Sequence, residues 1–175
     1  MKIEKIVVGF LRTNCYLLTI GDDCLIVDPG ADYNIIKERI GALNVLGILV
    51  THHHPDHVWA LTKIRNAYKA PVYDYKTGTV NCSVGSFTFD IIENKGHTKD
   101  SVTFYFKEDK VMLVGDFIFK GTVGRTDLPS GSDIDMRESL KLRKEYEPDI
   151  KLYPGHGHET NLGYEIEHNP YFKNI

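Results

Sequence analysis

Four apolar segments of the sequence each run directly into a loop that contains Asp or His. The segments end near Val27, Val50, Val114 and Tyr153, and the loops are Asp28-Pro29-Gly30, Thr51 to His57, Gly115-Asp116 and Pro154-Gly155-His156. Short apolar runs bounded by turn residues are typical of buried strands. Because rigid strands fix the geometry of the loops that follow them, the pattern predicts polar side chains gathered at one rim of a β-sheet structure.

Strand-like segments outnumber helix-like ones, and they come in runs. We expect strands at residues 3–8, 16–20, 24–27, 45–50, 71–74, 87–92, 102–106, 111–114 and 150–153. Helices are expected at Tyr33–Ile40, at 57–68 and at about 133–146, the last with Ser132 as N-cap and Asp135 three residues on. Runs of strands without strict strand–helix alternation favour an α+β protein in which helices cover a two-sheet sandwich.

Composition narrows the class of protein and of partner. The 175 residues suit a single domain spanning 1–175. The 21 Lys and Arg nearly balance the 24 Asp and Glu without a basic block, which argues against a nucleic-acid partner. Cys15, Cys24 and Cys82 form no CxxC pair, so a reduced, cytoplasmic setting is expected. No apolar run is long enough for a signal peptide or a membrane helix, so we expect no membrane partner. The expected partner is a small-molecule substrate, and the oligomeric state stays open.

The densest motif is Thr51-His52-His53-His54-Pro55-Asp56-His57. Side chains alternate along an extended segment, so His52 and His54 face one way and His53 faces the other. Asp56 and His57 follow at the turn into the next helix, where they reach a neighbouring point. Two adjacent groups of ligands indicate two adjacent metal ions.

Three isolated residues are candidates to complete such a site. His97 and His156 each lie in a glycine-containing loop after an expected strand, and Asp116 ends a very apolar one. A pair of ions needs more donors than the first motif supplies. A buried carboxylate is costly without a partner, so Asp116 caps a helix or binds metal. We favour metal, because a carboxylate can bridge two cations with its two oxygens.

These motifs are similar, in order and spacing, to those of the metallo-β-lactamase superfamily, and specifically of its small glyoxalase II-like members. The shared motifs are His-x-His-x-Asp-His, Gly-His-Thr, Gly-Asp-Phe, Gly-Arg-Thr-Asp and Pro-Gly-His-Gly, within a resemblance that spans about residues 14–170. The resemblance implies an αββα sandwich with the metal site at the open edge of the two sheets. It also implies a set of ligands: His52, His54 and His97 for the first metal, Asp56, His57 and His156 for the second, and Asp116 as the bridge. Asp28 and Thr51 match positions that support the ligands, and turn and cap roles explain both residues equally well.

The expected chemistry is hydrolysis. Zn²⁺ is the expected metal, with Fe²⁺ or Mn²⁺ as alternatives, because imidazole and carboxylate ligands suit all three. Metal binding lowers the pKa of water from ~15.7 towards ~7, and Asp56 and Asp116 are the catalytic candidates to orient that water and take up its proton. The resemblance implies cleavage of acyl thioesters of the hydroxyacylglutathione type. The alternatives are lactone hydrolysis on the same site, a mononuclear iron persulfide dioxygenase, which shares the Gly-Arg-Thr-Asp segment, and a metal-binding domain without catalysis.

The sequence also predicts roles for several residues near these motifs. Arg125, in the loop 120–132, either binds an anionic substrate or simply pairs with Asp127. We expect His53, His158 and His168 to be solvated and Trp59 and Tyr105 to lie in the core.

The chain departs from the family pattern at Lys99-Asp100-Ser101 and at Val58-Trp59-Ala60, both beside expected ligands. These departures leave the shape of the substrate more open than metal binding. Full-length glyoxalase II enzymes also carry a C-terminal helical domain that grips glutathione, and we expect this chain to lack it.

Overall fold

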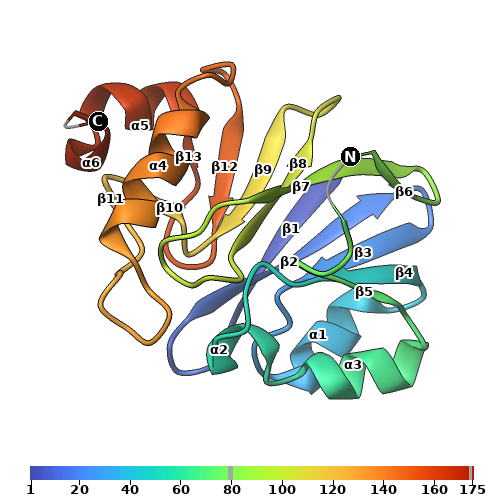
Figure 1. The fold of residues 1–175 in the computed structure, drawn as a ribbon. Coiled ribbons are helices and arrows are strands. Elements are labelled where there is room, and N and C mark those ends of the chain that lie inside the picture. Colours follow the sequence, from blue (N-terminus) through green and yellow to red (C-terminus); the bar gives the residue numbers. More distant parts are fainter. Residues whose placement is uncertain (79–80, 174) are drawn as a thin grey trace.

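Two mixed β-sheets lie face to face with helices on both outer surfaces (Figure 1). The structure is a computed structural model that describes residues 1–78, 81–173 and 175. The expected α+β architecture, an αββα sandwich, is confirmed. Within the described residues, none of the helices has the length and apolar character needed to cross a membrane.

The N-terminal sheet has the strand order β1-β2-β3-β4-β5. Its strands are β1 (Lys2–Val8), β2 (Thr13–Ile20), β3 (Asp23–Val27), β4 (Asn44–Leu49) and β5 (Val72–Tyr73). The first three are antiparallel, whereas β4 and β5 join in parallel register. The parallel joins are made through α1 (Tyr33–Ile40), α2 (Pro55–Val58) and α3 (Leu61–Tyr68). Parallel strands need such crossovers, which place the helices on the outer face.

The second sheet has the order β13-β12-β9-β8-β7-β6. Its strands are β6 (Cys82–Val84), β7 (Phe87–Glu93), β8 (Val102–Phe106), β9 (Val111–Gly115), β12 (Lys151–Pro154) and β13 (Thr160–Asn161). The pairing of β12 with β9 is parallel and the others are antiparallel. A small hairpin, β10 (Ile118–Phe119) with β11 (Thr122–Val123), follows β9, and the outer helices are α4 (Asp133–Arg143), α5 (Leu162–His168) and α6 (Pro170–Lys173).

Three layers of apolar side chains hold the sandwich together. Alternation along β2 sends Leu18 to the layer between the sheets and Leu17 to the layer beneath α1 and α3. In the second sheet, Leu113 enters the central layer and Met112 packs under α4. All five residues of β8 are buried, as expected for a strand covered on both faces. The strands next to the site are therefore fixed from both sides.

The structure corrects the expectation of one helix over 57–68. That segment forms α2 and α3, separated at Trp59 and Ala60. The backbone N–H of Ala60 donates to the carbonyl of Pro29 at 2.9 Å, outside the helical ladder. A Cβ on Gly30 would lie 1.7 Å from the carbonyl oxygen of Asp56, so the Pro29-Gly30 turn occupies the space beside that carbonyl. The contacts of the Pro29-Gly30 turn with Asp56 and Ala60 therefore end the first helix.

The expected N-cap of α4 and the expected burial of Tyr105 are confirmed, whereas the expected burial of Trp59 is wrong. Ser132 caps α4 by accepting a hydrogen bond from the backbone of Asp135 at 3.1 Å, although the helix ends at Arg143 rather than 146. Tyr105 is buried in the core, as expected. Trp59 is not, because its side chain is 69% exposed in the break between α2 and α3.

Candidate metal centre

Loops from both sheets meet at one edge of the sandwich. Asp28 follows β3 and the segment 51–57 follows β4, its parallel neighbour; Asp116 follows β9 and His156 follows β12, again parallel neighbours. His97 lies in the connection between β7 and β8. Because parallel neighbours end at the same edge of a sheet, the topology brings the loops of each pair together, and the packing of the two sheets brings the pairs and His97 to one place.

One group of the cluster is a trio of histidines. Nδ1 of His54 lies 3.1 Å from Nε2 of His52 and 2.9 Å from Nε2 of His97. His52 and His97 are buried, and His54 is half-buried. Three ring nitrogens that converge this closely are arranged to share one cation.

A second group lies beside the first. Oδ2 of Asp56 is 3.2 Å from Nε2 of His156 and 3.6 Å from Nε2 of His57. Asp116 lies between the two groups, with Oδ1 3.3 Å from Nε2 of His57 and Oδ2 3.6 Å from Nε2 of His97 and 3.5 Å from Nε2 of His156. One carboxylate therefore faces both groups.

The outer nitrogens of three rings are anchored by other groups. Nδ1 of His57 lies 2.9 Å from Oδ2 of Asp28, and Nδ1 of His52 lies 3.1 Å from the hydroxyl of Thr51. Nδ1 of His97 donates to the backbone carbonyl of Arg125 at 2.7 Å. A carbonyl only accepts, so neutral His97 carries its proton on Nδ1 and presents the Nε2 lone pair to the cluster. Such contacts orient metal-binding histidines in proteins.

Two buried atoms show that the cluster is suited to a cation. Nε2 of His57 and Oδ1 of Asp116 have no hydrogen-bond partner, although they lie 3.3 Å apart. Unsatisfied buried polar atoms are costly, and a metal ion between them would satisfy both. Imidazole and carboxylate donors suit Zn²⁺, Fe²⁺ or Mn²⁺ and do not choose among them.

Burial and neighbouring charges together set the protonation of four of these groups. It lowers the pKa of His52 well below the usual value and also lowers the pKa of His54, so both rings are neutral and available to a metal at pH 7. Burial opposes ionisation of Asp116, but His57 outweighs it and keeps the pKa of Asp116 below the ordinary value. Burial likewise disfavours charged His57, yet Asp28 and Asp116 raise its pKa to about 10. A metal ion that bound His57 would therefore displace a proton from it.

Backbone of glycine residues packs directly against the candidate ligands. A Cβ on Gly155 would lie 2.2 Å from Oδ1 of Asp116 and 2.6 Å from Cε1 of His57. One on Gly124 would lie 1.8 Å from the carbonyl oxygen of Asp116. Only glycine fits at either position.

The structure places most of the expected site residues close together. His52, His54, Asp56, His57, His97, Asp116 and His156 are gathered at one point, with Asp28 and Thr51 behind them. His53 turns away, as alternation predicts, but it is not simply solvated. Its Nδ1 lies 2.7 Å from Oδ2 of Asp100, which raises the pKa of His53. His168 ends α5, where Nδ1 contacts the carbonyl of Tyr164 at 3.0 Å, and His158 is exposed.

Sequence reasoning missed Thr13. Its hydroxyl donates to Oδ2 of Asp56 at 2.9 Å, and its backbone forms an isolated bridge with His156. A threonine at the start of a strand carries no distinctive signal, and the contact depends on how β2 reaches the loop after β12. Thr13 ties two parts of the second group together.

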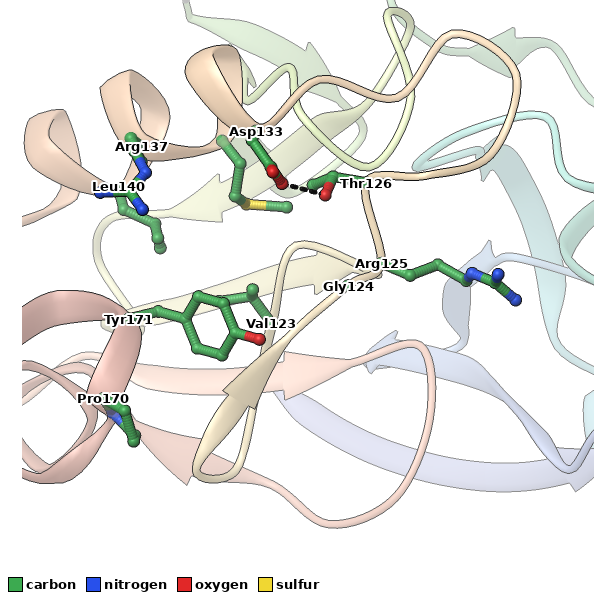
Figure 2. Close-up of a pocket in the computed structure, with 10 residues that line it drawn as sticks. Val123, Gly124, Arg125, Thr126, Asp133, Arg137, Leu140, Pro170 and Tyr171 are labelled. Atoms are coloured by element: carbon green, nitrogen blue, oxygen red, sulfur yellow. Dashed lines mark hydrogen bonds between the residues drawn. The ribbon is translucent and has the colours of Figure 1, made fainter.

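Arg125 pairs with Asp127 through two hydrogen bonds of 2.7 Å, one of the two expected arrangements. Its loop also borders a cavity of about 560 Å³ between α4 and α6 (Figure 2). The Arg125 side chain extends away from Leu140 and Tyr171, which line the far side of the cavity (Figure 2). No residue of the cluster lines this cavity, so it lies behind the loop that holds His97.

Comparison with known proteins places the sequence among metal-dependent enzymes. The family model described as the metallo-beta-lactamase superfamily matches residues 8–81 and 76–156. The chain is 30% identical to "Probable metallo-hydrolase YqgX" of Bacillus subtilis over 98% of this chain and 97% of that one. It is 29% identical to "Hydroxyacylglutathione hydrolase GloC" of Haemophilus influenzae over 98% of each.

Solved structures agree on the fold. BLEG-1 B3 metallo-beta-lactamase superposes with a TM-score of 0.92 at 27% identity, covering 98% of this chain and 99% of that one. TTHA1623, solved in a di-iron-bound form, superposes with a TM-score of 0.87 at 29% identity, covering 96% and 99%. These similarities extend over nearly the whole of each chain, including the edge where the cluster lies.

Proposed function

Since the chain belongs to the metallo-beta-lactamase superfamily, a superfamily of metal-dependent hydrolases, we propose that it cleaves small acyl thioesters of the hydroxyacylglutathione type. The observation that carries the proposal is the cluster itself: two groups of ligands that share Asp116. The similarity to the hydrolase of Haemophilus influenzae supports the choice of substrate class.

The proposed ligands of the first metal are His52, His54 and His97, those of the second are Asp56, His57 and His156, and Asp116 would bridge them. When bound, two such ions supply a water of lowered pKa and polarise a carbonyl oxygen. Asp56 and Asp116 would orient the attacking water and accept its proton, because both carboxylates lie within 3.5 Å of the same ring nitrogen, Nε2 of His156. Thr13 holds Asp56 for that task through its hydroxyl.

The leaving group favours thioesters over amides. A thiol with a pKa near ~8.5 departs as thiolate without a proton, whereas an amide nitrogen must be protonated as it leaves. The imidazoles and carboxylates of the cluster are all proposed as metal ligands, so none of them is set aside as an acid for a leaving group. The site therefore suits a substrate whose leaving group needs no acid.

Arg125 is proposed to bind an anionic part of the substrate. Its exposed guanidinium extends from the residue whose carbonyl holds His97, and its planar fork suits a carboxylate. Asp127 occupies that fork in the free protein and would have to yield it.

A comparison of substrates tests the proposal. On one preparation of metal-loaded protein, kcat/KM would be measured for lactoylglutathione, a thioester of a shorter thiol, a lactone and a β-lactam. We expect the thioesters to be cleaved fastest. If the lactone or the β-lactam wins by tenfold, about 1.4 kcal/mol in transition-state binding, the thioesterase assignment fails while a metal-dependent hydrolase remains.

A mononuclear iron persulfide dioxygenase is the second candidate, because the Gly-Arg-Thr-Asp segment resembles that group of enzymes and the imidazole and carboxylate donors of the cluster also suit Fe²⁺. Oxygen uptake with glutathione persulfide, recorded beside thioester hydrolysis on iron-loaded and zinc-loaded protein, separates the two. Oxygen uptake without thioester hydrolysis would favour the oxidoreductase.

A further inference from the structure

Three large apolar side chains are exposed beside the metal centre. Phe10 and Leu11, in the turn between β1 and β2, are 83% and 51% exposed, and Trp59 is 69% exposed. They line one shallow groove together with Thr13 and Asp56, and the exposed surface of this groove is almost entirely apolar. In Figure 1 the turn between β1 and β2 lies beside α2, the helix that precedes Trp59. Apolar side chains gathered on an exposed surface mark a site of binding.

The turn that carries Phe10 and Leu11 is fixed at both ends. The backbone N–H of Gly9 donates to Oδ2 of Asp32 at 2.8 Å, and the N–H of Arg12 closes the turn by donating to the Gly9 carbonyl at 3.1 Å. At the far end, Thr13 is tied to Asp56. These contacts hold the two apolar side chains out from the surface.

Asp56 belongs to the groove and to the metal cluster. A molecule that lies in the groove therefore lies next to the metal cluster. Arg125, whose carbonyl holds His97, lies at the other group of the cluster. The two sides of the cluster therefore offer different chemistry. The Arg125 guanidinium lies on the side of the histidine trio, and the apolar groove lies on the side of Asp56.

We infer that the groove binds the acyl chain of the substrate, and that among acyl and hydroxyacyl thioesters of glutathione the protein cleaves those with a longer aliphatic or an aromatic acyl chain faster than the lactoyl thioester. This inference rests on the proposed function. The groove holds only about 20 Å³, space for about one water molecule, so the acyl chain lies across Phe10 and Trp59 instead of being enclosed. A moderate preference follows, about tenfold between a six-carbon and a one-carbon chain.

Trp59 provides a direct test because it is the only tryptophan in the sequence. Its fluorescence would be titrated, on metal-loaded protein, with S-hexylglutathione and S-methylglutathione. Neither thioether can be hydrolysed, so the measurement reports binding alone. We expect S-hexylglutathione to shift the emission to shorter wavelength and to bind about tenfold more tightly, which corresponds to about 1.4 kcal/mol.

Phe10→Ala keeps the reporter and should abolish the tenfold preference. Leu142→Ala is the matched control: Leu142 is an apolar side chain 53% exposed near the end of α4, and this variant should keep the preference. Equal binding of the two thioethers, no emission shift with either, or an unchanged preference in Phe10→Ala would overturn the inference. An emission shift that follows protein concentration, with dimers in sedimentation, would assign the groove to a second copy and also overturn it.

A kinetic series separates this inference from the proposed function. The kcat/KM of wild-type protein would be measured for acetyl, lactoyl, hexanoyl and phenylacetyl thioesters of glutathione. Hydrolysis without dependence on the acyl group contradicts the groove and leaves the thioesterase standing. A preference for S-hexylglutathione in fluorescence without hydrolysis of any thioester contradicts the proposed function and leaves the groove standing.

Discussion

The carboxylate of Asp28 lies 2.9 Å from Nδ1 of His57, and the two side chains are 2% and 0% exposed. Asp28 also accepts hydrogen bonds from the backbone and the hydroxyl of Thr51 at 2.8 and 2.6 Å. One buried carboxylate thus fixes a proposed ligand and the segment that carries the histidine motif.

Replacement of Asp28 by Asn should weaken metal binding roughly 10- to 100-fold, because an amide holds His57 less strongly in its ligand orientation. Competition with a chromophoric chelator measures the affinity. Asp22→Asn, at an exposed turn, serves as the control for loss of one carboxylate. Unchanged affinity in Asp28→Asn would mean that His57 is oriented by the surrounding packing alone.

Asp116→Asn should lower both metal content, from about two equivalents per chain, and hydrolytic rate. A neutral amide cannot bridge two cations equally well, and Asp116 is the carboxylate that faces both groups. Metal analysis and initial rates on the same sample provide the test. Full metal content together with a normal rate would remove Asp116 from the site.

His53→Ala should keep full metal content and lose stability. The His53–Asp100 pair is 2.7 Å long, with side chains 39% and 16% exposed, so solvent screening reduces its contribution to about 1 kcal/mol. A double-mutant cycle with Asp100→Asn, followed by denaturant unfolding, measures the coupling, and exposed His158→Ala gives the baseline. Loss of metal as severe as in His52→Ala would show that alternation misassigned His53.

Arg125→Ala should raise KM severalfold for a glutathione thioester and leave KM nearly unchanged for a neutral one, the pattern of lost ground-state binding. Asp127→Asn frees the guanidinium and should lower KM for the same anionic substrate. Arg65→Ala, on α3, removes a charge elsewhere on the surface. Equal effects of Arg125→Ala on both substrates would assign it to support of the loop.

Thiol labelling at pH 8 should modify Cys82 in the native protein and spare the other two cysteines. Cys15 and Cys24 are fully buried, and burial raises the pKa of Cys24 to about 11 and that of Cys15 further above its usual range. Little thiolate is therefore present at either residue. An aromatic disulfide reagent should report one thiol before unfolding and three after. Two reactive thiols in folded Cys82→Ser would contradict the core packing around β2 and β3.

The sequence carries much of the fold in local patterns. Buried strands such as β8 and β9 are recognisable because their apolar residues are consecutive, and the histidine motif is recognisable because alternation along an extended segment is a property of the backbone. The features that escaped prediction depend on distant contacts. The helix break at Trp59 and Ala60 is caused by the Pro29 carbonyl, and Trp59 is exposed as a result.

The same distinction applies to the site. The proposed ligands stand in motifs with recognisable spacing, whereas Thr13 and Asp100 reach their partners across large sequence separations. Nothing in the local sequence around Thr13 indicates Asp56. Positions of this kind become visible only when the two sheets are assembled.

Gly155 and Gly124, which press against Asp116 and its neighbours, also limit how such a centre can diverge. A larger residue at Gly155 would displace the Asp116 carboxylate and one at Gly124 would displace the Asp116 backbone, so a single substitution at either position would disrupt the cluster. Change must accumulate in the outer turns, among them the one that carries Phe10 and the one that carries Arg125. The seven-residue cluster and its glycines would then tolerate single substitutions poorly, whereas the exposed side chains of these turns would tolerate them well.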